Sequence, residues 1–165
     1  MDDDRALVEQ QIGRPPRAFL RVARRCPYGR PAVTEQAPYD GAGEPFPTTY
    51  YLTCPYLVAA VARLEAAGGV ERWSAAVADD PELRESLRRA GDEQRAVRRE
   101  LAAGEGWSDG GASLELGIGG SRNPGQLKCL HAHAAYALAR PGYELGEAIL
   151  AEVEPSWPAD GCCSD

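Results

Sequence analysis

The sequence predicts an α+β fold, in which a small antiparallel β-element in the N-terminal third precedes a helix-dominated body. Six prolines between residues 27 and 55 prevent a long helix in that stretch and favour short strands joined by turns. After Cys54 the apolar residues recur at a spacing near 3.6, which is typical of amphipathic helices. Strands and helices do not alternate along the chain, and this order argues against a Rossmann-type sheet.

The first third contains one predicted helix and two predicted strands. The helix covers residues 4–12 and is ended by a glycine and a Pro-Pro pair. Residues 17–25 form either a strand or a helical turn, because periodicity does not separate the two over so short a window. β-Branched and aromatic residues predict strands at 31–36 and 48–53, with an Asp-Gly turn between them.

The remainder of the chain is predicted to be mainly helical. One helix begins at Pro55 and ends at a Gly-Gly pair, and further helices are predicted over 70–78, 80–101 and 127–139. The helix 80–101 has an Asp-Pro-Glu start, which combines an N-cap with a proline at the first helical position. Residues 104–125 are rich in Gly, Ser and Asp and predict a loop.

Length and charge limit the organisation and the partners. A chain of 165 residues fits one globular domain, over 5–152, with disordered ends at 1–4 and 153–165. Its 25 acidic and 18 basic residues give a net charge of -7, so no nucleic-acid partner is expected, because such proteins present a basic stripe. The chain has no long apolar run and an acidic N-terminus, which predicts a cytoplasmic protein without a membrane partner. A protein partner and the oligomeric state are left open.

Five cysteines in a chain expected to be cytoplasmic indicate thiols or metal ligands rather than disulfides. Cys26, Cys54 and Cys129 lie in segments predicted to be ordered, and His131 and His133 follow the third cysteine. Three thiolates and one of these imidazoles form a complete ligand set for zinc or for an iron–sulfur cluster. No CxxC or HxxxH pair is present, so the competing interpretation is three small, buried side chains.

Cys129 also qualifies as a catalytic nucleophile with a nearby histidine as its base. On a helix, Cys129 and His133 are four residues apart and share a face. Residues 123–126 resemble the first turn of that helix, which favours His133; a helix that begins only near Cys129 turns His131 toward the site instead. Each histidine has a competing structural interpretation as a hydrogen-bonded side chain. The adjacent cysteines 162 and 163, in the predicted tail, are assigned no role.

A glycine-rich loop, GIGGSRNPG, precedes the same helix. Gly119, Gly120 and Arg122 are candidates for binding an anion through backbone amides and a guanidinium group. The loop matches neither of the glycine motifs that bind phosphates, so a flexible connector is the competing interpretation.

Three blocks of sequence occur in order along the chain: RCPYGRPAV, PFPTTYYLTCPYL and KCLHAHAAYALA. Together they resemble the bacterial family called domain of unknown function 501, over roughly residues 5–145. The resemblance implies a small cytoplasmic bacterial protein without an established activity. The family pattern matches Cys26, Cys129 and His131, and it therefore favours His131 over His133 as the fourth ligand. The position of Cys54 is Cys or His among members, an exchange that suits a metal ligand.

The residues and the resemblance support three hypotheses. The first is a metal or iron–sulfur site with a structural, redox or catalytic role. The second is a non-catalytic interaction protein linked to cell division or the envelope, with helix 80–101 as a docking surface. It is implied by the genes near those of family members, which encode enolase, a septum-formation-initiator-like protein and an exopolyphosphatase-type protein. The third is a Cys–His thiol enzyme.

Overall fold

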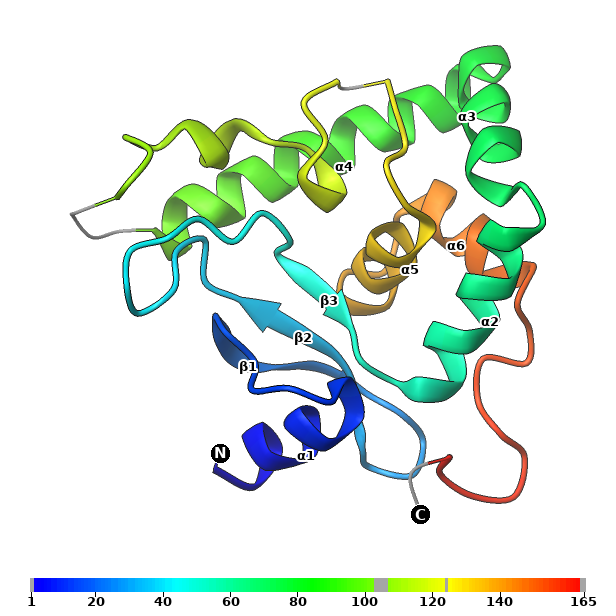
Figure 1. The fold of residues 1–165 in the computed structure, drawn as a ribbon. Coiled ribbons are helices and arrows are strands. Elements are labelled where there is room, and N and C mark those ends of the chain that lie inside the picture. Colours follow the sequence, from blue (N-terminus) through cyan, green and yellow to red (C-terminus); the bar gives the residue numbers. More distant parts are fainter. Residues whose placement is uncertain (1, 103–106, 124, 164–165) are drawn as a thin grey trace.

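A computed structural model describes residues 2–102, 107–123 and 125–163 of the chain. A three-stranded antiparallel sheet near the N-terminus is followed by a helix-dominated body (Figure 1), which confirms the predicted fold class. The strands are β1 (Phe19–Arg25), β2 (Pro31–Gln36) and β3 (Tyr50–Leu52). The α-helices are α1 (Asp2–Ile12), α2 (Pro55–Ala66), α3 (Gly69–Asp79), α4 (Pro81–Leu101), α5 (Leu130–Ala139) and α6 (Glu144–Ala151). Two short 3-10 helices are η1 (Ala112–Glu115) and η2 (Ile118–Gly120).

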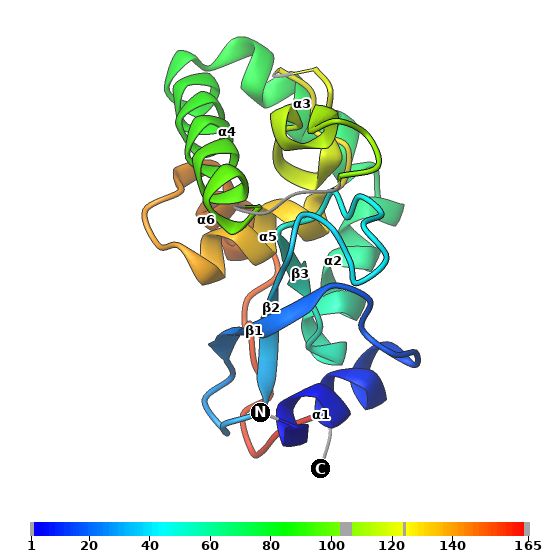
Figure 2. The same ribbon diagram turned by 90° about the vertical axis from the view of Figure 1, so that its left-hand side faces the viewer.

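The sheet has the order β1-β2-β3, so β2 is its central strand and β3 is an edge strand. All six residues of β2 are buried, including Glu35, whose carboxylate pairs with Arg21 of β1 at 3.0 Å. The pairing with β2 makes residues 19–25 a strand, which their own periodicity leaves undecided. Figure 2 shows α1 and both marked termini at one end of the molecule, with α4 toward the other end.

Helix α5 lies at the centre of the helical body and packs against β3, α6 and α2 (Figure 1). Eight of its ten residues are buried, as expected for a helix that is apolar on all sides. Its alanines allow close packing, and Gly146 of α6 lies so near that an added Cβ would be 2.6 Å from the His133 carbonyl oxygen. The body therefore forms around α5 as a buried axis.

Helix α5 begins at Leu130, three residues later than predicted, and Cys129 is its N-cap with extended backbone. The side chain of Asn123, which suggested an earlier start, accepts a hydrogen bond from the Gly125 amide within a turn. Pro124 lies outside the described residues. The capping pattern at Asn123 therefore stabilises a turn and does not begin the helix.

Helix α4 begins as predicted, because the Asp80 side chain accepts a hydrogen bond from the Glu82 amide and Pro81 occupies the first turn. Its inner face includes Arg98, which is fully buried. The guanidinium donates to the Phe46 carbonyl at 3.0 Å, and also to Thr49 and Ser113. Arg98 thus fastens the segment before β3 and the segment of η1 to the same helix.

The segment after α6 is irregular and follows the surface past α2 and α3. Glu152 forms an ion pair with Arg72 of α3 at 2.7 Å. Further on, the Tyr28 hydroxyl donates to the Pro158 carbonyl, and Trp157 packs against the core. These contacts hold residues 152–163 beside the turn between β1 and β2. None of the helices in the described part of the chain is long and apolar enough to cross a membrane.

Candidate functional site

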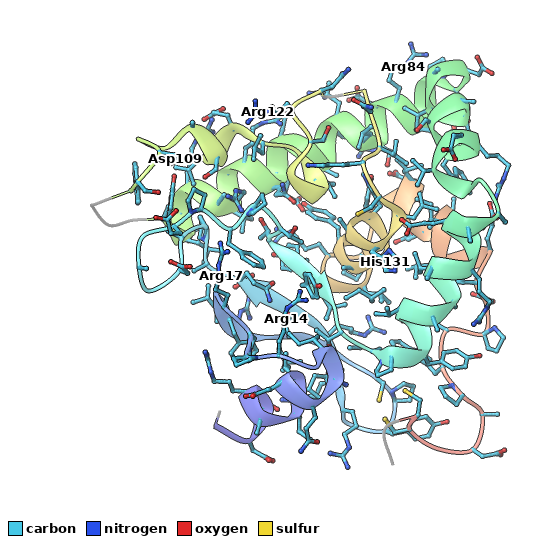
Figure 3. All side chains as sticks on the ribbon, in the orientation of Figure 1. Arg14, Arg17, Arg84, Asp109, Arg122 and His131 are labelled. Carbon is cyan, nitrogen blue, oxygen red and sulfur yellow. The ribbon has the colours of Figure 1, made fainter. Side chains whose placement is uncertain are left out.

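A cavity of about 330 Å³ lies where β3, α2 and the start of α5 meet. Figure 3 shows His131 at this place, between α5 and α2. The lining residues are Thr48, Tyr50, Tyr51, Leu52, Val58, Cys129, His131 and Ala132. The cavity therefore brings together parts of the PFPTTYYLTCPYL and KCLHAHAAYALA blocks, which are about 80 residues apart in sequence.

The edge strand β3 turns backbone polar groups toward this cavity. The Gln36 amide donates to the Thr49 carbonyl and the Thr53 amide donates to the Ala32 carbonyl, so residues 49, 51 and 53 face β2. The N–H and C=O groups of Tyr50 and Leu52 therefore point away from β2, on the side of α5 and the cavity. No backbone partner for these groups is found among the described residues.

The Cys129 thiol lies at the N-terminus of α5, beside Gly119 of η2. Burial raises the pKa of this thiol; the amides of Ala132 and His131 oppose the shift, and the charge of Glu65 adds to it. Cys129 is therefore a protonated thiol at neutral pH. This state differs from the depressed pKa that is typical of reactive cysteines.

His131 is held by two contacts to α2. Its Nδ1 lies 3.0 Å from a carboxylate oxygen of Glu65, and its Nε2 lies 3.2 Å from the Val58 carbonyl oxygen. Both ring nitrogens face oxygen atoms of α2, and these two contacts fix the orientation of the ring. The other oxygen of Glu65 accepts a hydrogen bond from the Leu130 amide at 2.6 Å.

Glu65 belongs to the site but was not predicted from the sequence. It occupies a position on the apolar stripe of α2, in line with Val61 and Leu64. A carboxylate on a stripe that faces the core needs a partner there, because an unpaired buried charge is costly. This position was the one indication in the sequence that α2 receives a polar group from elsewhere.

His133 does not share the cavity of Cys129. Its Nδ1 lies 2.7 Å from the Tyr143 hydroxyl, next to α6, and its ring is fully buried. Burial lowers the pKa of His133 to about 4, so the ring is neutral. Because Cys129 is an N-cap with extended backbone, the four-residue helical spacing that favoured His133 does not apply.

Cys26 and Cys54 do not line this cavity. The Cys26 amide donates to the Arg30 carbonyl, and the Cys54 amide donates to the Ala32 carbonyl. Cys54 is the N-cap of α2 and lies between Leu52 and Val58, which both line the cavity. Burial raises the pKa of Cys54 to about 11.

Of the four predicted metal ligands, Cys129 and His131 line the cavity, whereas Cys26 and Cys54 do not. Within residues 2–102, 107–123 and 125–163, no group of three or more His, Cys, Asp or Glu side chains is placed to hold a metal ion. The zinc or iron–sulfur hypothesis stays a prediction, which elemental analysis of the purified protein tests.

The residues of the predicted anion-binding loop also lie in separate places. Gly119 packs on α5, where an added Cβ would lie 3.2 Å from Ala132 and 3.8 Å from the Cys129 sulfur. Its φ of +72° also favours glycine. Arg122 instead lines a larger groove of about 630 Å³, and Figure 3 shows it on the side of Asp109, away from His131.

The larger groove offers polar groups that already have partners. The Asp109 carboxylate accepts hydrogen bonds from the Tyr39 hydroxyl and from the amides of Gly111 and Ser113. Burial alone raises the pKa of Asp109, but these hydrogen bonds outweigh it and the net shift is downward. Glu115 forms an ion pair with Arg99 at 2.7 Å. The Cys129 cavity is the better candidate, because its strand edge and thiol are available.

Comparison with known proteins gives a family and no activity. A family model described as "Protein of unknown function (DUF501)" matches residues 22–151. No curated protein and no solved structure matches the chain.

Proposed function

Since the chain belongs to this family of proteins of unknown function, DUF501, we propose its function from the cavity itself: it binds a small, mostly apolar ligand that carries an amide-like polar group. The observation that supports this proposal is the meeting of an open strand edge, a thiol and an imidazole at one cavity. Binding pockets are typically apolar clefts with a few polar groups that orient the ligand.

The polar groups define the chemistry of the ligand. The backbone of Tyr50 and Leu52 offers donors and acceptors in alternation, the pattern with which an edge strand binds a peptide-like group. The Thr48 hydroxyl and the Cys129 thiol add two groups that donate or accept. Leu52, Val58 and Ala132 supply apolar walls. A ligand with an amide and one apolar substituent complements both surfaces.

Binding is favoured over catalysis by the state of the two reactive side chains. The Cys129 thiol is protonated, and neither nitrogen of His131 is available as a base while it holds its contacts to Glu65 and Val58. These features suit recognition of an uncharged group.

Binding is tested with N-acetyl-leucinamide as the probe and amide chemical shifts of the labelled protein as the readout. We expect shifts concentrated at residues 48–52 and 129–132. Val58→Phe fills the cavity and should weaken binding at least tenfold. Val70→Phe is the matched control, because Val70 also packs on the core but does not line the cavity. Shifts gathered at residues 109–122, or equal weakening by both variants, would contradict the proposal.

A second candidate function is thiol chemistry at Cys129. It is favoured by one observation, that the amides of His131 and Ala132 at the N-terminus of α5 stabilise the thiolate against the effect of burial. Under this candidate, chloroacetamide modifies Cys129 at neutral pH faster than it modifies the exposed Cys163. Slower modification of Cys129, measured by peptide mass spectrometry, would contradict thiol chemistry and leave ligand binding as the proposed function.

A further inference from the structure

A second, smaller cavity of about 40 Å³ lies between α1 and the sheet. Val8 and Pro16, which are both buried, supply apolar lining. Ile12 and Phe46 also line the cavity and are partly exposed, so its opening to solvent is apolar as well. The volume accommodates a group of about three non-hydrogen atoms, because one water needs roughly 10–15 Å³.

One buried polar group of this cavity has no partner. The Thr53 side chain lines the cavity, the residue is 1% exposed, and its hydroxyl has no hydrogen-bond partner within the described part of the chain. The two other buried polar side chains of the cavity, Thr34 and Gln36, share a hydrogen bond at 2.5 Å. Buried hydroxyl groups are normally hydrogen-bonded, so the Thr53 hydroxyl indicates a place where another molecule contributes the partner.

Arg14 supplies a positive charge to the same cavity. Helix α1 ends before Gly13, whose φ of +75° turns the chain out of the helix. The Arg14 guanidinium then donates a hydrogen bond to the Tyr51 hydroxyl at 3.1 Å. Among the described residues, no acidic side chain pairs with Arg14, and none lines the cavity. This guanidinium therefore has a neutral partner and no counter-charge.

Arg17 lines the cavity too, but its charge is already balanced. It forms an ion pair with Asp40 at 2.9 Å, and its guanidinium lies 5.1 Å from the centre of the Phe46 ring. Figure 3 shows Arg14 and Arg17 near β1 and β2 and apart from His131. One unbalanced guanidinium matches the single charge of a carboxylate better than the two charges of a phosphate.

We propose that this cavity binds a small aliphatic carboxylate. The carboxylate accepts hydrogen bonds from the Arg14 guanidinium and the Thr53 hydroxyl, which gives both groups the partner that they lack. The aliphatic part contacts Val8, Ile12 and Pro16. The combination of one cation, one buried hydroxyl and an apolar lining is typical of a site for an acid with a short hydrocarbon chain.

This site is separate from the Cys129 cavity and does not depend on the function proposed for it. Tyr50 and Leu52 line the Cys129 cavity, whereas Thr53 lines the smaller one, and only Tyr51 lines both. Side chains alternate between the two faces along an extended chain. The two cavities therefore lie on opposite faces of the segment that contains β3.

The experiment titrates the full chain with sodium propionate, at a total salt concentration held constant with sodium chloride, and follows the amide chemical shifts. We expect shifts concentrated at residues 8–17, 34–36 and 51–53. Residues 129–132, which the amide probe of the Cys129 cavity is expected to shift, should not respond. Propionamide has the same shape without the charge and should bind at least tenfold more weakly. Equal binding of propionate and propionamide, or shifts caused by inorganic phosphate alone, would overturn the proposal.

Two variants assign the binding to the two polar groups. Arg14→Gln should weaken propionate binding at least tenfold, whereas Arg84→Gln removes the same charge from an exposed position of α4 and should not change it. Thr53→Val keeps the shape of the side chain and should weaken binding at least threefold. It should not lower the unfolding midpoint of the ligand-free protein, because the hydroxyl that it removes has no partner. Equal propionate binding by Arg14→Gln and Arg84→Gln, or no shifts at residues 8–17 and 51–53 in the unmodified protein, would also overturn the proposal.

Discussion

Glu65 in the last turn of α2 and His131 in the first turn of α5 are joined by a 3.0 Å contact between Oε1 and Nδ1. The second oxygen of Glu65 accepts the Leu130 amide, one of the N–H groups that a helix start leaves without a partner. One carboxylate of α2 therefore both caps α5 and orients the histidine of the cavity.

Replacement of Glu65 should destabilise the protein. Glu65→Ala leaves the Leu130 amide and the His131 ring without their acceptor, at an expected cost of roughly 2–3 kcal/mol in the free energy of unfolding. Glu65→Gln keeps an acceptor for Leu130 and should cost less. Urea unfolding measures both, with the exposed Glu100→Ala as the control expected within about 0.5 kcal/mol of wild type. Equal stability of Glu65→Ala and Glu100→Ala would show that the carboxylate does not join the helices.

Arg98 and Arg99 allow the contribution of a buried arginine to stability to be compared with that of an exposed one. Arg98→Ala leaves the carbonyl groups of Phe46 and Ser113 without their donor and opens a void, at an expected cost of roughly 3 kcal/mol or more. Arg99→Ala removes only an exposed ion pair with Glu115 and should cost less than about 1 kcal/mol. The urea concentrations at the unfolding midpoints of Arg98→Ala and Arg99→Ala should differ clearly. A similar loss in both variants would contradict the anchoring role of Arg98.

The local sequence patterns predicted the helices and strands more completely than they predicted the contacts between these elements. Residues 31–36 were predicted as a strand and form β2, and the Asp-Pro-Glu start of α4 is where the sequence places it. The predicted start of α5 was wrong by three residues, because the capping pattern at Asn123 belongs to a turn. Whether two residues meet depends on which helix ends pack together, and no local pattern encodes that.

The candidate site illustrates the same limit. Cys129 and His131 were singled out by residue type and lie in one cavity. Cys54 lies between Leu52 and Val58, which both line this cavity, but Cys54 itself is not among the lining residues. Cys162 and Cys163 were assigned no role, because the sequence predicts that they lie in a disordered tail.

Gly146 should not tolerate a side chain. An added Cβ would lie 2.6 Å from the His133 carbonyl oxygen and 2.7 Å from the Ala137 Cβ, and both belong to the rigid axis of α5. Gly146→Ala should therefore cost roughly 2–3 kcal/mol through displacement of α6. Gly41→Ala is the control, because nothing lies within 4 Å of its added Cβ and its stability should be near wild type. Thermal unfolding of the two variants checks the contact between α5 and α6.

The buried ring of His133 should make stability depend on pH. Burial lowers its pKa to about 4 from 6.5, so between these values the unfolded chain binds a proton that the folded chain does not. Stability therefore falls as the pH falls through this window, by about 2 kcal/mol from this residue at pH 5. The measurement is the loss of unfolding free energy from pH 7.5 to 5, which should be smaller by that amount in His133→Gln. Identical losses would mean that the ring is protonated in the folded state.

The alkylation of Cys129 should report the charge of Glu65. Burial is the main cause that raises the pKa of this thiol, and the Glu65 carboxylate raises it further by disfavouring a second negative charge nearby. The rate of reaction with iodoacetamide should therefore be low at neutral pH and keep rising above the ~8.5 at which a free cysteine ionises. Glu65→Gln removes the negative charge and should move the midpoint of the pH profile of Cys129 downward, whereas Glu100→Gln should leave it in place. A midpoint that stays unchanged in Glu65→Gln would separate Cys129 electrostatically from the Glu65–His131 pair, and the cavity would then consist of two independent polar groups.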